Sequence, residues 1–291
     1  MDTDQNQNQN PPSLENFHIH NQEKQDKKQE NEELMNQSFT DKLLEEEIKE
    51  ITGYKFNDPC LLQQAFTDSS YHDNCLSYER LEYIGDSVLN LLIAKEHYFI
   101  YPDLPPGRLT RLRAANVDTE KLARVALKWN LHKFLRHKKP LLDGQIESFT
   151  EAISAYPLHS SGLVDAPKVL ADIVESLIGA IFLDCNSSLD TTWQVVKNLL
   201  QPMIIPTTLQ THPVTKLNEI CQKNGLKIKF VDLWKERGEI EVYVDHEYAG
   251  RGKYNSKRLI AVNRAANNAY DQIASKLSTV EDMQQSCRCN G

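Results

Sequence analysis

The chain has 291 residues, of which 40% are hydrophobic, 25% charged and 8% aromatic, as in globular proteins. This length allows one or two domains with a core that needs no disulfides. No apolar run reaches the roughly 18–20 residues that span a bilayer, and the acidic, amide-rich start differs from a secretory signal, so we expect no membrane partner. The cysteines show no metal-ligand spacing, and the lack of a secretory signal favours reduced thiols and an intracellular protein, in the nucleus, the cytoplasm or both.

Charge is distributed unevenly along the chain. The net charge of −8, taken as an average, argues against a nucleic-acid partner. Residues 1–50 carry thirteen acidic residues against five lysines, whereas residues 211–279 carry twelve lysines and arginines against eight acidic residues. A basic module at the C-terminal side of an acidic chain is compatible with polyanion binding.

The composition predicts five segments. Residues 1–38 are rich in Gln, Asn, Glu and Lys and are predicted to form a disordered acidic tail. Apolar residues at spacings of three and four predict a mostly helical domain over 39–200. A linker rich in proline and threonine at 201–211 leads to a module at 212–280, and residues 281–291 are predicted to be a flexible tail.

The module at 212–280 differs in secondary structure from the helical domain before it. A helix, three strands and a closing helix are predicted at 214–225, 227–234, 239–245, 248–252 and 258–277. Within the helical domain, residues 140–167 contain scattered Gly, Ser and Pro with weak periodicity, which predicts a long loop or an insertion. The expected fold class is therefore an all-α domain followed by a small α+β module of α-β-β-β-α order.

Two short acidic patterns lie within apolar helical segments. In the first, Glu82 and Asp86 are four residues apart and Glu79 precedes Glu82 by three, so all three share one helical face. In the second, Asp172 and Glu175 are three residues apart and also share a face. Each pattern alone is common on solvent-exposed helices, but both of these helices are apolar enough to pack into a core.

The two patterns together predict a metal site. Buried carboxylates lose their hydration, and neighbouring acids repel one another unless a cation lies between them. Hard oxygen ligands suit Mg²⁺. The alternative is that each pair faces solvent or binds Arg or Lys, and the spacing does not show whether the two helices meet. Gly85, which weakens a helix, indicates close approach of another backbone.

The first pattern, Glu79-Arg-Leu-Glu-Tyr-Ile-Gly-Asp-Ser, resembles the signature of the ribonuclease III family. Further motifs in the family's order are Ala65-Phe-Thr-Asp-Ser-Ser-Tyr, Gly107-Arg-Leu-Thr-Arg-Leu-Arg-Ala, Asn116-Val-Asp-Thr-Glu-Lys-Leu-Ala and Lys168-Val-Leu-Ala-Asp-Ile-Val-Glu-Ser-Leu-Ile-Gly-Ala. The resemblance covers roughly residues 42–200 and implies a ribonuclease III endonuclease domain at 39–200. One such domain with one C-terminal module is most similar to plant ribonuclease III-like proteins.

The resemblance implies roles for individual residues. The family's four catalytic, metal-binding acids correspond to Glu82, Asp86, Asp172 and Glu175. They would hold Mg²⁺, with Mn²⁺ as a substitute, to activate water and stabilise the charge that develops on a phosphodiester. Glu79 and Lys168 match supporting positions, and Lys168 would neutralise the scissile phosphate unless it is simply a solvated lysine. Tyr83 matches the aromatic position at the family's dimer interface, which implies a homodimer.

One position departs from the family pattern. Asp68 stands where the family's Thr-His-Ser pattern usually has histidine, which puts local helix or interface contacts in doubt. No metal ligand is missing, so the sequence gives no ground for an inactive enzyme.

The module at 212–280 resembles a double-stranded-RNA-binding domain. Such domains read duplex shape through phosphates and 2′-hydroxyls. The residues expected to contact RNA are Thr215, Asn218 and Glu219 on the first helix and Lys257, Arg258 and Arg264 on the last. The loop at 235–238 is short and lacks the family's usual Gly-Pro-x-His stretch, which makes RNA contacts from that loop doubtful.

These features predict an endoribonuclease that hydrolyses double-stranded RNA with Mg²⁺, as a homodimer with one cleavage site per chain. By analogy with the family it would leave 5′-phosphates and short 3′ overhangs, in RNA processing or a small-RNA pathway. The alternatives are a non-catalytic RNA-binding protein that keeps the nuclease fold for dimerisation, and a helical scaffold that needs no metal.

Overall fold

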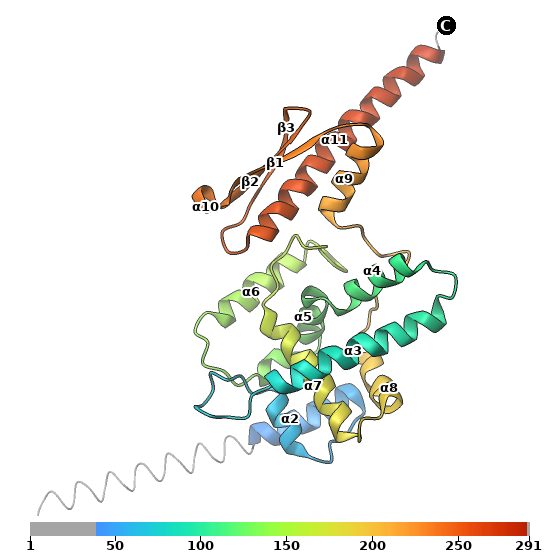
Figure 1. Ribbon diagram of the computed structural model, residues 1–291. Coiled ribbons are helices and arrows are strands. Elements are labelled where there is room, and N and C mark those ends of the chain that lie inside the picture. Colours follow the sequence, from blue (N-terminus) through green and yellow to red (C-terminus); the bar gives the residue numbers. More distant parts are fainter. Residues whose placement is uncertain (1–38, 290–291) are drawn as a thin grey trace, which may run out of the picture. The chain divides into compact units, whose positions relative to one another are not determined.

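The computed structural model describes residues 39–289 (Figure 1). The tail predicted at 1–38 lies outside the described residues. The chain divides after Lys55 into two compact units. In the first unit, residues 39–52 form a helix that ends where Gly53 adopts a φ of +70° and donates its N–H to the carbonyl oxygen of Lys49. Glycine takes this left-handed capping conformation without steric cost.

The second unit starts with an all-helical region. Its elements are α2 (Pro59–Ala65), α3 (Glu79–Ile100), α4 (Pro106–Val117), α5 (Thr119–Lys128), the 3₁₀ turn η1 (Leu131–Phe134), α6 (Leu142–Ile153), α7 (Lys168–Asp184) and α8 (Leu189–Leu199). Side-chain caps fix several of the helix starts. Asp118 accepts the N–H of Lys121 at the start of α5, and Ser188 accepts the N–H of Thr191 at the start of α8.

The helix α7 is the centre of this region and is buried along most of its length. It packs against α3 and α5, and α3 lies beside it in Figure 1. Two glycines allow α3 and α7 to meet closely. A Cβ atom at Gly85 would lie 1.8 Å from the carbonyl oxygen of Glu175, and one at Gly179 would lie 2.2 Å from that of Leu81. The close backbone approach that Gly85 predicts is confirmed.

The long loop predicted at 140–167 is wrong over Leu142–Ile153, where the structure has α6. One face of this helix is buried, through Leu142, Ile146 and Phe149. Gly144 and Ser148 are poor helix formers, and they obscure this apolar periodicity in the sequence. Residues 154–167 contain no helix or strand.

The segment predicted as a linker, 201–211, is bonded to the helical region. The side chain of Asn116 donates to the carbonyl oxygen of Ile204 and accepts its N–H, both at 2.8 Å. The buried ammonium of Lys121 donates to the carbonyl oxygens of Leu200, at 2.7 Å, and Pro202, at 2.5 Å. The linker is therefore held by side chains of α4 and α5.

The C-terminal part contains both helices and strands. Its elements are α9 (Pro213–Lys223), β1 (Ile228–Leu233), α10 (Trp234–Arg237), β2 (Glu239–Val244), β3 (Glu247–Lys253) and α11 (Arg258–Cys289). The strands form an antiparallel sheet in the order β1-β2-β3. Asp245 and His246, both with positive φ, form the tight turn between β2 and β3. The predicted order of helix, three strands and helix is confirmed, and α10 is an additional single turn within it.

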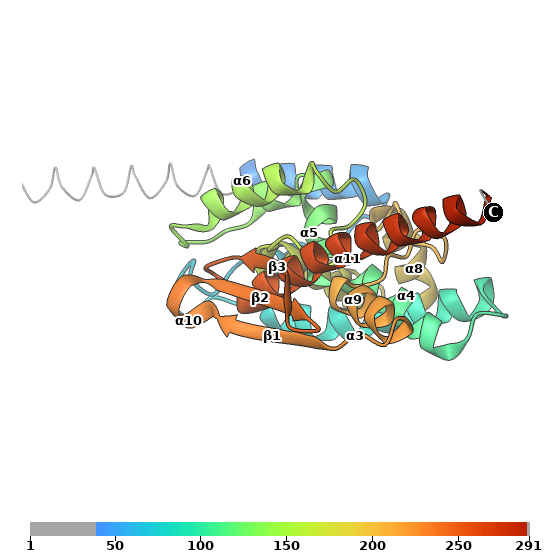
Figure 2. The ribbon, with the colours of Figure 1, turned by 90° about the horizontal axis from the view of Figure 1, so that it is seen from above.

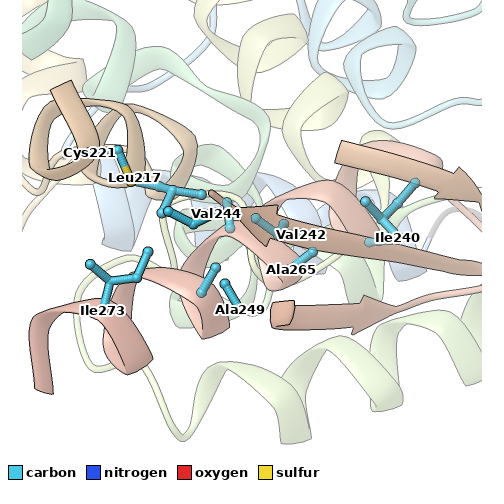
Figure 3. Close-up of a cluster of buried hydrophobic side chains, with 11 residues drawn as sticks. Leu217, Cys221, Ile240, Val242, Val244, Ala249, Ala265 and Ile273 are labelled. Atoms are coloured by element: carbon cyan, nitrogen blue, oxygen red, sulfur yellow. The ribbon is translucent and has the colours of Figure 1, made fainter. Parts of the chain in front are cut away.

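The two longer helices of this part pack together on one face of the sheet. α11 lies along β2 and β3, and α9 packs against α11 (Figure 2). Leu217 and Cys221 from α9, Val242 from β2 and Ile273 from α11 share one buried apolar cluster (Figure 3). Gly250 and Gly252 of β3 lie directly against the backbone of α11, which allows the sheet and the helix to approach closely.

The last helix extends farther than the sequence predicts. α11 continues from Arg258 through Cys289, so the flexible tail predicted at 281–291 is helical up to that residue. No proline or glycine lies between Leu277 and Cys289 to end the helix. Among the described helices, none is long and apolar enough to cross a membrane.

Candidate active site

Three acidic side chains meet beside the glycine contact between α3 and α7. Glu82, Asp172 and Glu175 each offer one carboxylate oxygen, and these three oxygens lie within 4.8 Å of one another. Glu82 comes from the first turn of α3, and the other two come from α7. Because Gly85 packs directly on the backbone of Glu175, the close helix contact and the acid cluster are parts of one arrangement.

Asp86 faces the same space but is not a member of this three-acid cluster. It lines a cavity of about 330 Å³ together with Glu82, Asp172 and Glu175. One of its carboxylate oxygens accepts a hydrogen bond from the Asn90 side chain at 2.8 Å. The structure thus brings three of the four predicted metal ligands together and places the fourth on the wall of the same cavity.

Lys168 supplies a positive charge within the cluster. Its ammonium nitrogen lies 2.6 Å from Glu82 Oε1 and 2.6 Å from Asp172 Oδ1. Burial lowers the pKa of Lys168, but the hydrogen bonds to Asp172 and Glu82 outweigh this effect and raise the pKa above its ordinary value. The lysine therefore stays charged, and the two carboxylates already share one cation.

The cluster nevertheless carries more negative charge than Lys168 compensates. Burial raises the pKa of Glu175 to about 8, and the charges of Asp86, Asp172 and Glu82 act in the same direction. Burial also raises the pKa of Asp172, against the opposing hydrogen bond from Lys168. A carboxyl group that retains its proton at neutral pH indicates that the site lacks positive charge.

The donor set fits a hard divalent cation. Glu82, Asp172 and Glu175 offer only oxygen atoms, from two helices, and they line a cavity of about 330 Å³. Such ligands suit Mg²⁺ and Mn²⁺. These three residues would hold the ion, with Asp86 on the adjacent wall.

The other residues predicted at the site lie around this cluster. Glu79 lines the cavity, but its carboxylate accepts hydrogen bonds from Ser77 at 2.7 Å and from Ser69 at 3.0 Å. It therefore fixes the segment that precedes α3. Tyr83 also lines the cavity and is 79% exposed.

Two buried residues that the sequence did not indicate as site residues lie behind Asp172. The hydroxyl of Tyr78 lies 3.4 Å from Asp172 Oδ2 and 3.2 Å from Asp68 Oδ2. Burial would raise the pKa of Asp68, but hydrogen bonds from Lys139 and Ser70 hold it below its ordinary value. The sequence showed the unusual Asp68. It did not show that Tyr78 links this residue to Asp172, which lies 94 positions beyond the tyrosine.

Three of the residues predicted to contact RNA lie on α9. Asn218 and Glu219 are exposed there, and Thr215 is partly buried. Their exposure leaves the first helix of the module free to contact a ligand at two of the three positions.

The other three lie on α11 or immediately before it, and each already has a partner. Lys257 is exposed and forms an ion pair with Asp165 at 2.5 Å, and Arg258 forms one with Asp232 at 2.7 Å. Arg264 lies over the ring of Tyr254 and donates to the carbonyl oxygens of Leu163 and Lys253. Lys257 and Arg258 each pair with a single carboxylate, whereas Arg264 is more firmly held within the protein.

Comparison with known proteins shows the family to which the chain belongs. The family model of the ribonuclease III domain matches residues 79–186. Ribonuclease 3-like protein 3 from rice (Oryza sativa subsp. japonica) is 49% identical over 234 residues, which cover 79% of this chain and 78% of the rice protein. Endoribonuclease Dicer homolog 1 from Arabidopsis thaliana is 43% identical over 232 residues, 77% of this chain and 12% of that protein.

A solved structure, the nuclease domain of ribonuclease III from Campylobacter jejuni, matches with a TM-score of 0.44 and 27% identity, over 54% of this chain and 95% of that chain. The rice relative is similar over most of the length of both proteins. The chain therefore belongs to the ribonuclease III family, in which its relatives include the ribonuclease 3-like proteins of rice and Arabidopsis.

Proposed function

We propose that this protein is a divalent-metal-dependent endoribonuclease that cuts double-stranded RNA. The observation that carries the proposal is the cluster of Glu82, Asp172 and Glu175, whose carboxylate oxygens lie within 4.8 Å of one another beside a cavity. Mg²⁺, or Mn²⁺ in its place, is the proposed cofactor. The reaction is hydrolysis of a phosphodiester bond that leaves a 5′-phosphate and, on a duplex, short 3′ overhangs.

The chain's own residues have separate tasks in this proposal. Bound Mg²⁺ would supply an activated water and stabilise the charge that develops on the phosphate. Glu82, Asp172 and Glu175 would hold the ion, and Asp86 accepts a hydrogen bond from Asn90 on the cavity wall. Lys168 lies 2.6 Å from two of these acids and, when they bind the ion, its ammonium is free to pair with the phosphate of the substrate.

The C-terminal part is proposed to be a double-stranded-RNA-binding domain. Its order, α9-β1-β2-β3-α11, places Asn218 and Glu219 on an exposed helix and Lys257 and Arg258 at the start of another. Lysine and arginine at a helix N-terminus combine their charges with the helix dipole at a phosphate. RNA would thus be bound by one module and cut by the other.

A homodimer is proposed as the working form. Tyr83 projects from α3 with 79% of its surface exposed, and other large apolar side chains on or beside this helix, Leu76 and Leu91, are at least half exposed. A contiguous exposed apolar patch marks an interaction surface, and we assign these side chains to the dimer interface. Two copies would provide two acid clusters, one for each strand of a duplex.

The experiment is a cleavage assay on a defined RNA duplex, with and without millimolar Mg²⁺, followed by sequencing of the product ends. Wild type should cut only with the metal. Glu175→Ala should abolish cleavage and still retard the duplex in a gel, because this acid serves the ion and not the RNA. Wild-type protein that shifts the duplex but never cuts it would favour the RNA-binding alternative, and cleavage that survives Glu175→Ala would rule out this acid cluster as the active site.

A further inference from the structure

A buried chain of polar groups leads from the protein surface to one of the proposed metal ligands. It starts at Lys139, whose ammonium donates to Asp68 Oδ2 at 2.5 Å. It continues through the Tyr78 hydroxyl, 3.2 Å from the same oxygen, and ends at Asp172 Oδ2, 3.4 Å from that hydroxyl. Asp68 and Tyr78 are only 1% and 4% exposed, so water has little access to either side chain.

Asp68 is held in place from three sides. Its second carboxylate oxygen accepts the N–H of Ser70 at 2.9 Å, and its own N–H donates to the carbonyl oxygen of Arg136 at 2.9 Å. The pairing of the neighbouring Thr67 with Arg136 brings the 136–139 segment alongside, which places Lys139 next to Asp68. An aspartate in this buried position needs a cation, and Lys139 provides it.

Tyr78 is fixed as firmly as Asp68. Its N–H donates to the carbonyl oxygen of Thr67 at 2.8 Å, and its own carbonyl oxygen accepts the N–H of Glu82 at 2.8 Å. The ring therefore enters the core directly at the start of α3. Its hydroxyl lies between two carboxylates and shares its single proton between them, at 3.2 Å from Asp68 Oδ2 and 3.4 Å from Asp172 Oδ2.

The two oxygens of Asp172 have different partners as a result. Oδ1 lies 2.6 Å from the ammonium of Lys168, the cation shared with Glu82. Oδ2 faces the Tyr78 hydroxyl, on the side of the buried chain. This division leaves Oδ1 for a cation and keeps Oδ2 for a hydrogen bond within the protein.

We propose that Tyr78 and Asp68 are positioning residues for Asp172: Asp68, anchored by Lys139, orients the Tyr78 hydroxyl, and this hydroxyl holds Asp172 so that Oδ1 is presented to the metal. This inference rests on the proposed function, because it assigns a role toward the same ion. Hydrogen-bonded partners behind a metal ligand fix its orientation, and their loss weakens metal binding.

The test is the affinity of the full-length protein for Mn²⁺ alone, without RNA, measured by titration calorimetry or electron paramagnetic resonance. Tyr78→Phe removes the hydroxyl and keeps the ring, so the fold should persist. Its Mn²⁺ affinity should fall about tenfold, the lower end for such partners. The matched control is Tyr243→Phe, which removes a hydroxyl bonded to Glu241 at 3.0 Å on the sheet and should leave the affinity unchanged.

Asp68→Asn, alone and combined with Tyr78→Phe, distinguishes a positioning role from a general effect on the stability of the fold. Because both residues act through the same chain, Asp68→Asn should weaken Mn²⁺ binding in wild type but add little to Tyr78→Phe. The Mg²⁺ concentration that half-saturates cleavage should rise by a similar factor in both single variants, while cleavage at saturating Mg²⁺ recovers.

The outcomes distinguish this inference from the proposed function. Unchanged Mn²⁺ affinity and unchanged Mg²⁺ dependence in Tyr78→Phe would overturn the positioning role, even if wild type is an active nuclease. Additive losses in the double variant would also overturn it, because they indicate independent effects on the fold. Weaker Mn²⁺ binding in both variants, together with a wild type that cuts no duplex, would support the positioning role and refute the nuclease.

Discussion

The protonation of Glu175 depends on its burial and on the charges of its neighbours. Its pKa of about 8 arises first from burial and then from the charges of Asp86, Asp172 and Glu82. Lys168 offsets only part of this repulsion, because its contacts are with Glu82 and Asp172. The protonation of one side chain is therefore coupled both to metal binding and to the stability of the fold.

We predict that the metal-free protein loses stability as the pH rises between about 4.5 and about 8. In this range folded Glu175 keeps its proton, whereas the unfolded chain, with the ordinary pKa of 4.5, has released it. Because the folded state binds more protons, the free energy of unfolding decreases with pH. The expected loss is on the order of 1–2 kcal/mol, after allowance for partial exposure.

Thermal melts at pH 5 and pH 8, with a chelator and with Mg²⁺, measure this effect. Addition of Mg²⁺ should restore stability at pH 8, and Glu175→Gln should remove most of the pH dependence. The assignment would be contradicted if the melting temperature of the metal-free wild type increased from pH 5 to pH 8 while that of Glu175→Gln decreased over the same range.

At the scale of the elements, the contact between α3 and α7 decides whether the acids meet. A methyl group at position 85 would overlap the carbonyl oxygen of Glu175, so the two helices would have to separate. We predict that Gly85→Ala destabilises the protein by about 2–3 kcal/mol and weakens Mn²⁺ binding. Urea unfolding and Mn²⁺ titration measure the two effects.

A second glycine gives the matched control. Gly144 lies within α6, and a Cβ atom there would meet nothing within 4 Å. Gly144→Ala should be neutral or stabilise the protein by up to about 1 kcal/mol, because alanine favours the helix. Equal stability of the two alanine variants would show that the helix contact does not need Gly85.

The start of α11 is the element on which RNA affinity should depend. Lys257→Ala combined with Arg258→Ala should weaken duplex binding and reduce the salt slope by about 1–2, since each lost phosphate contact removes about 1 from the slope. Cleavage at saturating RNA should persist, because both residues lie outside the acid cluster. The effect on affinity should be moderate, since both side chains leave a carboxylate partner when they bind phosphate.

Binding titrations at several salt concentrations measure this prediction. Lys276→Ala is the control, because this lysine lies farther along α11 and pairs with Glu247. A double variant with wild-type affinity and an unchanged salt slope would place the RNA on another face of the module.

At the scale of the whole molecule, the property to test is whether two chains form a dimer. We predict that Tyr83→Asp yields a monomer in analytical ultracentrifugation and reduces cleavage of both strands, because a charge at a buried interface loses its hydration. Leu141→Asp is the control, since Leu141 is also largely exposed but lies immediately before α6 and not on α3. A Tyr83→Asp protein that remains a dimer would exclude this surface from the interface.

Much of the fold was predictable because it depends on local signals. The signature around Glu82, the apolar helix that carries Asp172 and Glu175, and the change to strands after residue 225 all follow from periodicity and motif. The helix α6 was not predictable in this way, because Gly144 and Ser148 interrupt its pattern. The continuation of α11 to Cys289 also escaped prediction, since a polar helix has little apolar periodicity.

The sequence by itself determined which residue types are available and where each helix carries its acids, because spacing along a helix fixes which side chains share a face. Only the tertiary structure decided that Glu82 meets Asp172 and Glu175, that Asp86 stands to one side, and that Tyr78 reaches Asp172. Contacts between residues some ninety positions apart depend on how closely two helices pack, and here Gly85 and Gly179 set that distance.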